Sequence, residues 1–233
     1  MNLSPFPVDP QVMARIRPMQ FRDAAAVAAL HHAAMGESLW ARVGLNFLRV
    51  LYGTLIDSEG FLAFVYEEDG EVRGFIAGST DPDRVMRETF RRAWWLLGPA
   101  ALPGALRPGV LRRLAQTGRY ARVSAVDLPS GCQAESLFCS FAPELRGKRV
   151  AGHINKVLFD ELAARGHRWV KITTDASNTA ARRQLESWGF EARGSFRFYG
   201  KEMTTWALDL SASPRVEPRS RHPMLERARP PQG

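Results

Sequence analysis

Strand-like alternation of apolar and polar residues is clearest in one pair of segments. Residues 61–66 and 72–77 are two β-rich runs, and Asp69-Gly70 between them is a dipeptide typical of two-residue hairpin turns. Upstream, residues 14–19 alternate in the same way. The pattern therefore predicts a short first strand followed, further along the chain, by a β-hairpin.

Helical spacing of apolar residues dominates the stretch between these strands. Arg22-Asp23 precede an Ala-rich run and predict the start of a helix. A second amphipathic helix is predicted over residues 39–55, where apolar residues recur every three or four positions: Trp40, Val43, Phe47, Leu48, Leu51 and Leu55.

Residues 81–122 differ from the rest because arginines are interleaved with large apolar residues. A helix is predicted to begin at Pro82. Its inward-facing residues would be Val85, Phe90, Trp94 and Leu97, and its outward-facing residues Arg84, Arg87, Arg91 and Arg92. Pro and Gly at 98–99 and 103–104 predict a break before a second short helix holding Val110, Leu111 and Leu114. We interpret the segment as a packed helical insertion with a solvated arginine face. A lid, a dimer surface, and a patch that contacts an acidic membrane or substrate are the alternatives.

A strand, a basic turn and a helix follow one another from residue 134 onward. Residues 134–141 are β-compatible, and Pro143 ends the run because it cannot donate a ladder hydrogen bond. The turn at residues 146–149 reads Arg-Gly-Lys-Arg, and the helix after it ends near Gly166. Free amides at such a turn and helix N-terminus bind phosphate groups. The segment therefore predicts a phosphorylated cofactor, and a basic surface loop is the alternative.

Alternating strand and helix signals complete the chain. Asn178 is the predicted N-cap of a helix over residues 179–187, and Gly189 ends that helix. The strands are predicted at residues 169–174, 190–194, 195–199 and 202–210. Residues 1–13 read as a flexible leader, and residues 211–233, rich in Pro and Arg, as a disordered tail.

Charge and composition restrict the classes of function. The chain has 233 residues, a net charge of +8 and a pI near 10.2, which suits anionic ligands such as cofactor phosphates, nucleic acid or an acidic membrane. It has no aromatic–basic module, so we expect no nucleic-acid partner. Two cysteines, the lack of a signal peptide and the lack of a sufficiently long apolar run predict a cytoplasmic protein without a transmembrane segment. The histidines show no metal-ligand spacing, so no metal site is expected.

Two sequence motifs occur in the order found in a known superfamily. Residues 146–151 read Arg-Gly-Lys-Arg-Val-Ala, and downstream come Asn178, Ala181 and then Trp188-Gly189-Phe190. With the upstream hairpin, this arrangement resembles the GNAT superfamily of N-acetyltransferases. The resemblance implies an α/β (α+β) domain over residues 14–210, with a mixed, mostly antiparallel central sheet flanked by helices. The helical insertion at residues 81–122 would precede the cofactor-binding strand.

The resemblance also implies where acetyl-CoA (coenzyme A), the co-substrate, would bind. The strand at Cys139, Ser140 and Phe141 would hydrogen-bond the pantetheine arm through its backbone. The pyrophosphate would lie in the turn formed by Arg146, Gly147, Lys148, Arg149, Val150, Ala151 and Gly152. Asn178, with Ala181 after it, would lie near the pantetheine arm, although Asn178 also suffices as a helix cap. Arg149 departs from the family pattern, which usually has glycine at that position.

Acetyl transfer to an amine needs a base, a polarised thioester carbonyl and an acid for the departing thiolate. Glu135 is the candidate base, because a carboxylate in a weakly polar strand is costly unless it is used or paired. A surface-facing strand position and a salt bridge to an arginine of the insertion are the alternatives. Leu185 occupies the position of the family's usual tyrosine acid, so Tyr199 or water is the candidate acid. Cys139 reads as a buried strand residue and not as a nucleophile.

The acceptor amine is open at this point. An N-acyltransferase acting on a primary amine of a small molecule by direct attack in a ternary complex is the leading hypothesis. A protein or peptide N-acetyltransferase and a catalytically silent acetyl-CoA-binding protein are the alternatives. The apolar run at residues 94–97 would suit a homodimer surface or a substrate lid.

Overall fold

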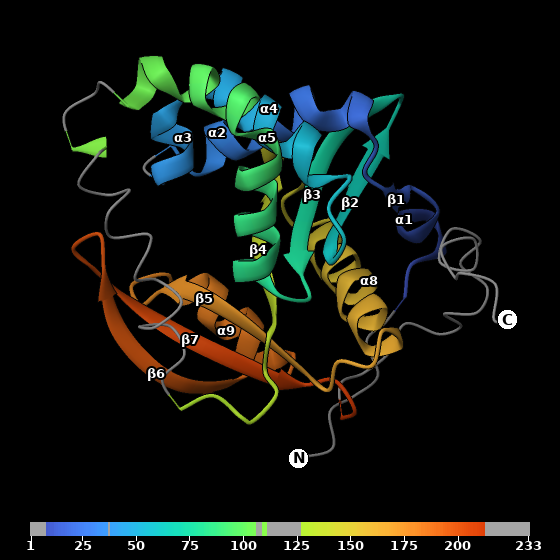
Figure 1. Ribbon diagram of the computed structural model, residues 1–233. Helices are drawn as coiled ribbons and strands as arrows, with labels where there is room; N and C mark the ends of the chain where they lie inside the picture. Colours follow the sequence, from blue (N-terminus) through green and yellow to red (C-terminus); the bar gives the residue numbers. More distant parts are fainter. Residues whose placement is uncertain (1–7, 37, 106–108, 111–126, 213–233) are drawn as a thin grey trace, which may run out of the picture.

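A seven-stranded sheet organises the molecule (Figure 1). The computed structural model describes residues 8–36, 38–105, 109–110 and 127–212. The strand order is β1-β2-β3-β4-β5-β7-β6, and every neighbouring pair is antiparallel except β4 and β5. The strands are β1 (Ile16–Pro18), β2 (Phe61–Glu68), β3 (Glu71–Ser79), β4 (Ala134–Phe141), β5 (Trp169–Asp175), β6 (Glu191–Phe198) and β7 (Lys201–Asp209). This is the mixed, mostly antiparallel sheet that the sequence predicted.

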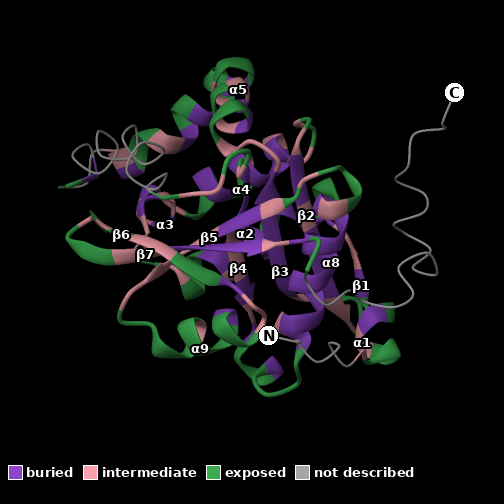
Figure 2. Cartoon of the chain, turned by 90° about the horizontal axis from the view of Figure 1, so that it is seen from below, coloured by how far each residue is buried: buried purple, intermediate pink, exposed green. Residues whose placement is uncertain are grey.

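Helices cover both faces of this sheet. The α8 face is covered by α8 (Val150–Ala164), with α1 (Pro10–Ala14) and α9 (Thr179–Ser187) on the same side. The α2 face is covered by α2 (Ala24–Ala34), after a short turn of 3-10 helix at Phe21–Asp23. Packed outside α2 are α4 (Leu45–Leu55), α3 (Leu39–Val43) and α5 (Pro82–Ala105). Each face has its own cluster of buried apolar side chains. Figure 2 shows that the central strands and α8 are largely buried.

The predicted hairpin and the predicted strand–turn–helix segment are confirmed. The β2–β3 turn places Asp69 at φ 54° and Gly70 at φ 78°, the two left-handed residues that a tight hairpin requires. Strand β4 ends at Phe141, and α8 begins at Val150 directly after the basic turn. Beyond α8, Gly166 at φ 86° provides the predicted left-handed residue.

Residues 39–55 form two helices, so the prediction of a single helix was wrong. Gly44 separates α3 from α4 with φ 130° and ψ 164°, angles that only glycine adopts readily. The apolar periodicity continues across Gly44, which is why spacing alone did not show the break.

The predicted burial and break points of α5 also need correction. The break lies earlier than predicted, at Ala93, where φ −119° and ψ 21° make a kink between two helical halves, and the second half continues past Pro99 and Pro103. Trp94, predicted to face inward, is 71% exposed. Val85 and Leu97 are buried as predicted, and the other buried positions are Thr89, Ala93, Ala100 and Gly104. A Cβ on Gly104 would lie 1.8 Å from the carbonyl oxygen of Val43, so α5 approaches α3 too closely there for any side chain. Of the predicted second helix, Leu111 and Leu114 lie outside the described residues.

The C-terminal strands differ from prediction in two respects. Residues 190–199 were predicted as two strands but form a single strand, β6, with a register shift between Ala192 and Gly194. Tyr199, predicted in a strand, lies with Gly200 in the β6–β7 turn at φ 50° and 80°.

The predicted leader overlaps α1, which begins at Pro10, while residues 1–7 and 213–233 lie outside the described residues. Among the helices of the described segments, none is long and apolar enough to cross a bilayer.

His31 on α2 is a buried histidine whose ionisation should affect stability. Its ring nitrogens lie 2.7 Å from the Tyr52 hydroxyl and 3.3 Å from Ser38 Oγ. Burial, and secondarily the charge of His32, lowers the pKa of His31 to about 4. The unfolded chain binds this proton near the ordinary value of 6.5, so stability is full above that pH and falls as the pH drops towards 4.

We therefore expect the free energy of unfolding to fall by about 2–3 kcal/mol between about pH 7 and about pH 4.5 through His31 alone. In His31→Gln this contribution disappears and the acid limb becomes shallower, whatever stability the substitution itself costs. Denaturant unfolding at several pH values measures the difference. The exposed neighbour His32→Gln is the matched control, and an equally steep acid limb in His31→Gln would contradict the assignment.

Candidate functional site

The two parallel strands at the centre of the sheet separate part-way along their length. Pairing between β4 and β5 covers three residue pairs and ends with Ser136 and Ile172. Beyond this point β4 remains paired with β3 as far as Phe141, and β5 remains paired with β7 as far as Asp175. In the described part of the chain, residues 137–141 therefore have no strand partner on the β5 side. Main-chain N–H and C=O groups at that edge can hydrogen-bond an elongated ligand.

A bulge in β4 marks where this separation begins. The register with β3 shifts so that Gly78 pairs with Ser136 and Ala77 with Phe138, which leaves Leu137 as the extra residue. After the bulge, Ser140 points to the α2 face, where its hydroxyl donates to the carbonyl of Leu30 at 3.0 Å. Cys139 points to the α8 face, 3.6 Å from Asn155 Nδ2, and burial raises the pKa of its thiol to about 12. A thiol that stays protonated is a poor nucleophile, which supports the interpretation of Cys139 as a structural residue.

The basic turn has the backbone geometry of an anion site. Gly147 lies at φ 82° and Arg149 at φ 57°, and the N–H of Lys148 donates to the carbonyl of Leu145 at 3.1 Å. The amides of the first helical residues, Val150 to Gly152, have no acceptor within the helix. All four residues at 146–149 are exposed, and the three side chains among them are cationic. The turn thus presents amide donors, a helix N-terminus and positive charge at one place.

Arg149 adopts the left-handed conformation that glycine usually supplies. A non-glycine residue there costs about 1 kcal/mol. Neighbouring bonds hold the conformation, because His153 Nδ1 lies 2.9 Å from the Arg149 carbonyl oxygen. His153 Nε2 accepts a hydrogen bond of 2.8 Å from the N–H of Asp9, which leaves Nδ1 as the donor to that carbonyl. The side chain of His153 thereby joins the start of α1 to the basic turn.

The N-terminus of α9 is capped as predicted. Asn178 Oδ1 accepts a hydrogen bond of 3.1 Å from the N–H of Ala181. Just before it, the carboxylate of Asp175 accepts from the hydroxyl and the N–H of Ser177, and Lys201 Nζ lies 3.1 Å away. These hydrogen bonds, followed by Lys201, lower the pKa of Asp175 to about 2.

A pair of substitutions at Asn178 separates its capping role from a cofactor contact. We expect Asn178→Ala to lose about 1 kcal/mol of stability, because the Ala181 amide loses its acceptor. Asn178→Ser should retain most of that stability, since serine is also a good N-cap. Thermal unfolding measures the stability that the cap contributes. Titration of both variants with acetyl-CoA measures whether the side-chain amide of Asn178 contributes to cofactor affinity. Unchanged stability in Asn178→Ala would contradict the capping role.

Glu135 is buried at the closed end of the separated strands. Only 3% of it is exposed, and its Oε2 atom lies 3.2 Å from Lys171 Nζ, which is its register partner on β5. Neighbouring Ala134 and Val170 pack on the α8 face, so the two charged side chains point to the α2 face. The carboxylate is thus neither surface-facing nor, in the described part of the chain, paired with an arginine of the insertion. Nearby Cys132 has its thiol pKa raised to about 11, mainly by burial.

The other candidate acid–base residues lie in different settings. Tyr199 is half-buried in the β6–β7 turn, lies tilted against Phe198 with 3.9 Å between ring centroids, and packs against the cluster of the α2 face. Leu185 is 4% exposed and packs in the cluster of the α8 face. No group of three or more metal-ligating side chains occurs within residues 8–36, 38–105, 109–110 and 127–212.

Solved structures with the same architecture identify the fold. An acetyltransferase of the GNAT family from Desulfovibrio desulfuricans is 14% identical, with a TM-score of 0.53 over 84% of this chain and 98% of its own. SsHAT is 19% identical, with a TM-score of 0.60 over 84% of this chain and 97% of its own. The ribosomal-protein-S18-alanine N-acetyltransferase from Escherichia coli is 16% identical, with a TM-score of 0.51 over 84% of this chain and 92% of its own. No family model and no curated protein sequence matches the chain. The chain has the GNAT fold.

Within this GNAT fold, sequence reasoning missed two residues beside the predicted site. Lys171 is the partner of Glu135, and a lone lysine in the β-rich run at residues 169–174 was its signal. His153 holds the Arg149 carbonyl, and its position on the first turn of α8 was its signal. A groove of about 810 Å³ is lined by the β5–α9 loop and by β6 and β7. Of the predicted cofactor and catalytic residues, none lines that groove.

Proposed function

We propose that this protein is an acyl-CoA-dependent N-acyltransferase that transfers acetyl from acetyl-CoA to a primary amine of a small molecule. The observation that carries the proposal is the end of the β4–β5 ladder after Ser136, close in sequence to the basic turn at residues 146–149. One region offers main-chain groups for an amide-bearing arm, and the other offers amides and cations for a pyrophosphate. A ligand that needs both is a coenzyme A thioester.

The residues of this region fit such a co-substrate. We assign the pantetheine arm to the main chain of residues 139–141 and the pyrophosphate to the amides of residues 147–152. Gly147 leaves open space, since a Cβ there would meet no atom within 4 Å. The exposed side chains of Arg146, Lys148 and Arg149 supply positive charge. We also assign Asn178 and Ala181, at the start of α9, to the surroundings of the pantetheine arm.

The chemistry proposed is direct attack within a ternary complex. The neutral amine nitrogen forms a bond to the thioester carbonyl carbon, the carbon–sulfur bond breaks, and the thiolate leaves. We assign Glu135 to accept the proton that the amine loses, with Lys171 positioning its carboxylate. Tyr199 is assigned to donate a proton to the thiolate. The cytoplasmic location we propose agrees with the two cysteines, which are both free thiols.

An acceptor on a protein or peptide is the second candidate. It is favoured by neighbours such as the ribosomal-protein-alanine N-acetyltransferase from Brucella melitensis, which is 19% identical with a TM-score of 0.52. Presenting acetyl-CoA with a panel of small amines and a panel of peptides, while measuring thiol release, distinguishes the two classes. Release with small amines alone supports our proposal, and release with peptides alone supports the second candidate. Cofactor binding without release from either panel would indicate a silent acetyl-CoA-binding protein.

A further inference from the structure

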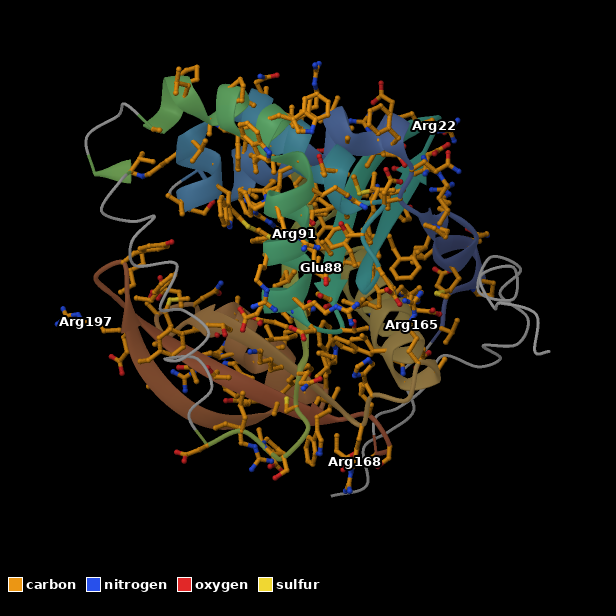
Figure 3. The ribbon with its side chains drawn as sticks, in the orientation of Figure 1. Arg22, Glu88, Arg91, Arg165, Arg168 and Arg197 are labelled. Carbon is orange, nitrogen blue, oxygen red and sulfur yellow. The ribbon has the colours of Figure 1, made fainter. Side chains whose placement is uncertain are left out.

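Lys171 differs from most cations of the chain because it is buried. The chain contains four lysines, at positions 148, 156, 171 and 201. The side chain of Lys171 is 11% exposed. That of Arg168, three residues earlier, is 69% exposed and projects from the periphery of the molecule (Figure 3). A buried ammonium is costly unless it is paired or used, so Lys171 has either a structural or a chemical role.

The position of Lys171 is at the closed end of the separated strands. It pairs in register with Glu135, one residue before the β4–β5 ladder ends at Ser136 and Ile172. One residue along a strand is a rise of about 3.3 Å. The pantetheine arm that we assign to residues 139–141 starts from the basic turn, so its thioester end points towards this closed end. The inference that follows rests on that proposed function, which brings the reactive carbonyl close to Lys171.

The ammonium of Lys171 has the relation to Glu135 that an acceptor amine would need. Lys171 Nζ lies 3.2 Å from Glu135 Oε2, and a base must lie about 2.6–3.2 Å from the group whose proton it takes. The lysine side chain also ends in a primary amine, the group on which the proposed reaction acts. Lys156 is likewise buried in an ion pair, 2.9 Å from Asp160, but it lies within α8. Lys171 is therefore the lysine that combines the amine, the base and the location.

We propose that Lys171 is a self-acetylation site, which takes the acetyl group from bound acetyl-CoA when no acceptor is present. Its ammonium first passes one proton to Glu135, which leaves the buried pair without net charge. Nζ then forms a bond to the thioester carbonyl carbon, and the carbon–sulfur bond breaks with its electron pair on sulfur. The second nitrogen proton goes to the thiolate, which leaves as coenzyme A, and Glu135 releases its proton to solvent.

Self-acetylation of this residue would inactivate the enzyme. The amide that forms is neutral, so the carboxylate of Glu135 loses the cation that positions it. The added acetyl group also fills the space that an acceptor amine needs beside the base. A bound acceptor would in turn compete with Lys171 for the thioester. Excess acceptor amine should therefore protect Lys171 from acetylation.

Peptide mass spectrometry tests the proposal, after incubation of the full chain with acetyl-CoA that carries a deuterated acetyl group. Deuterium distinguishes new acetylation from any that occurred during expression. We expect Lys171 to gain label at least about tenfold faster than Lys156 and Lys201. Lys156 is the matched buried lysine, and Lys201, whose side chain is 62% exposed, measures uncatalysed acetylation. In Glu135→Gln, labelling of Lys171 should slow by at least about tenfold.

Two results would overturn the proposal. One is a Lys171 that gains label no faster than Lys201, as expected of a purely structural ion pair. The other is undiminished labelling of Lys171 in Glu135→Gln, with circular dichroism and thermal unfolding as the check that the variant is folded.

The outcome is separable from that of the proposed function. Thiol release with external amines from a protein whose Lys171 stays unlabelled overturns this inference alone. Label on Lys171 without thiol release for any external amine supports this inference and counts against an external acceptor. Binding of acetyl-CoA with neither label nor thiol release overturns both.

Discussion

Replacing Glu135 with Gln is expected to reduce kcat for acetyl transfer by about 10²–10⁴-fold, the range typical of losing a general base. The amide has nearly the same shape as the carboxylate but does not accept the proton from the amine. Acetyl-CoA affinity should change little, because Glu135 lies on the α2 face at the closed end of the strands and not at the basic turn. Steady-state kinetics and cofactor titration measure the two effects separately.

The same substitution should destabilise the fold, which needs its own control. Lys171 would keep a buried ammonium without its carboxylate partner, at a cost of about 3 kcal/mol. The double variant Glu135→Gln/Lys171→Met removes both charges and should recover most of the stability without recovering activity. A purely structural pair would instead leave a stably folded double variant as active as the wild type. That result would remove Glu135 from the mechanism.

Replacing Gly147 with Asp is expected to raise the Kd for acetyl-CoA by about 100-fold, because the new carboxylate would lie close to the pyrophosphate and repel it. The fold should survive. A Cβ at Gly147 meets no atom within 4 Å, and Asp is among the residues that tolerate a φ of 82°. Calorimetric titration with acetyl-CoA measures the affinity, and thermal unfolding checks the fold.

Gly147→Asn is the matched control, because asparagine tolerates the same backbone conformation and carries no charge. Gly147→Asn should bind acetyl-CoA more tightly than Gly147→Asp, and this difference should account for most of the expected increase of about 100-fold in Kd. Arg149→Gly examines the neighbouring position, where relief of the left-handed strain should add about 1 kcal/mol of stability. Equal affinity in the Asp and Asn variants would show that the turn does not face a phosphate.

Local signals in the sequence were sufficient to predict most of the helices, strands and turns. The Asp69-Gly70 turn, the helix cap at Asn178 and the strand that ends before Pro143 each depend on residues close together in the chain. Backbone conformation preferences act at that range, so the sequence alone could reveal them.

Features that depend on distant residues were not predictable in the same way. Gly44 divides a continuous apolar pattern, and Gly104 selects which side of α5 is buried through its contact with Val43. Of the candidate site, the basic turn and strand β4 were predicted as segments, whereas the partner of Glu135 was not. Lys171 reaches Glu135 only because β4 and β5 are paired in parallel at that point. Strand order and register are tertiary properties.

The side chain of His153 connects the N-terminal segment to the basic turn. Asp9 and His153 are 144 residues apart, yet one hydrogen bond joins them, and a second joins His153 to Arg149. A ligand that orders the turn should therefore slow deuterium exchange at the Asp9 amide. By the same linkage, removing residues 1–14 should accelerate coenzyme release. On this basis, the protection factor of the Asp9 amide would report whether the basic turn is occupied.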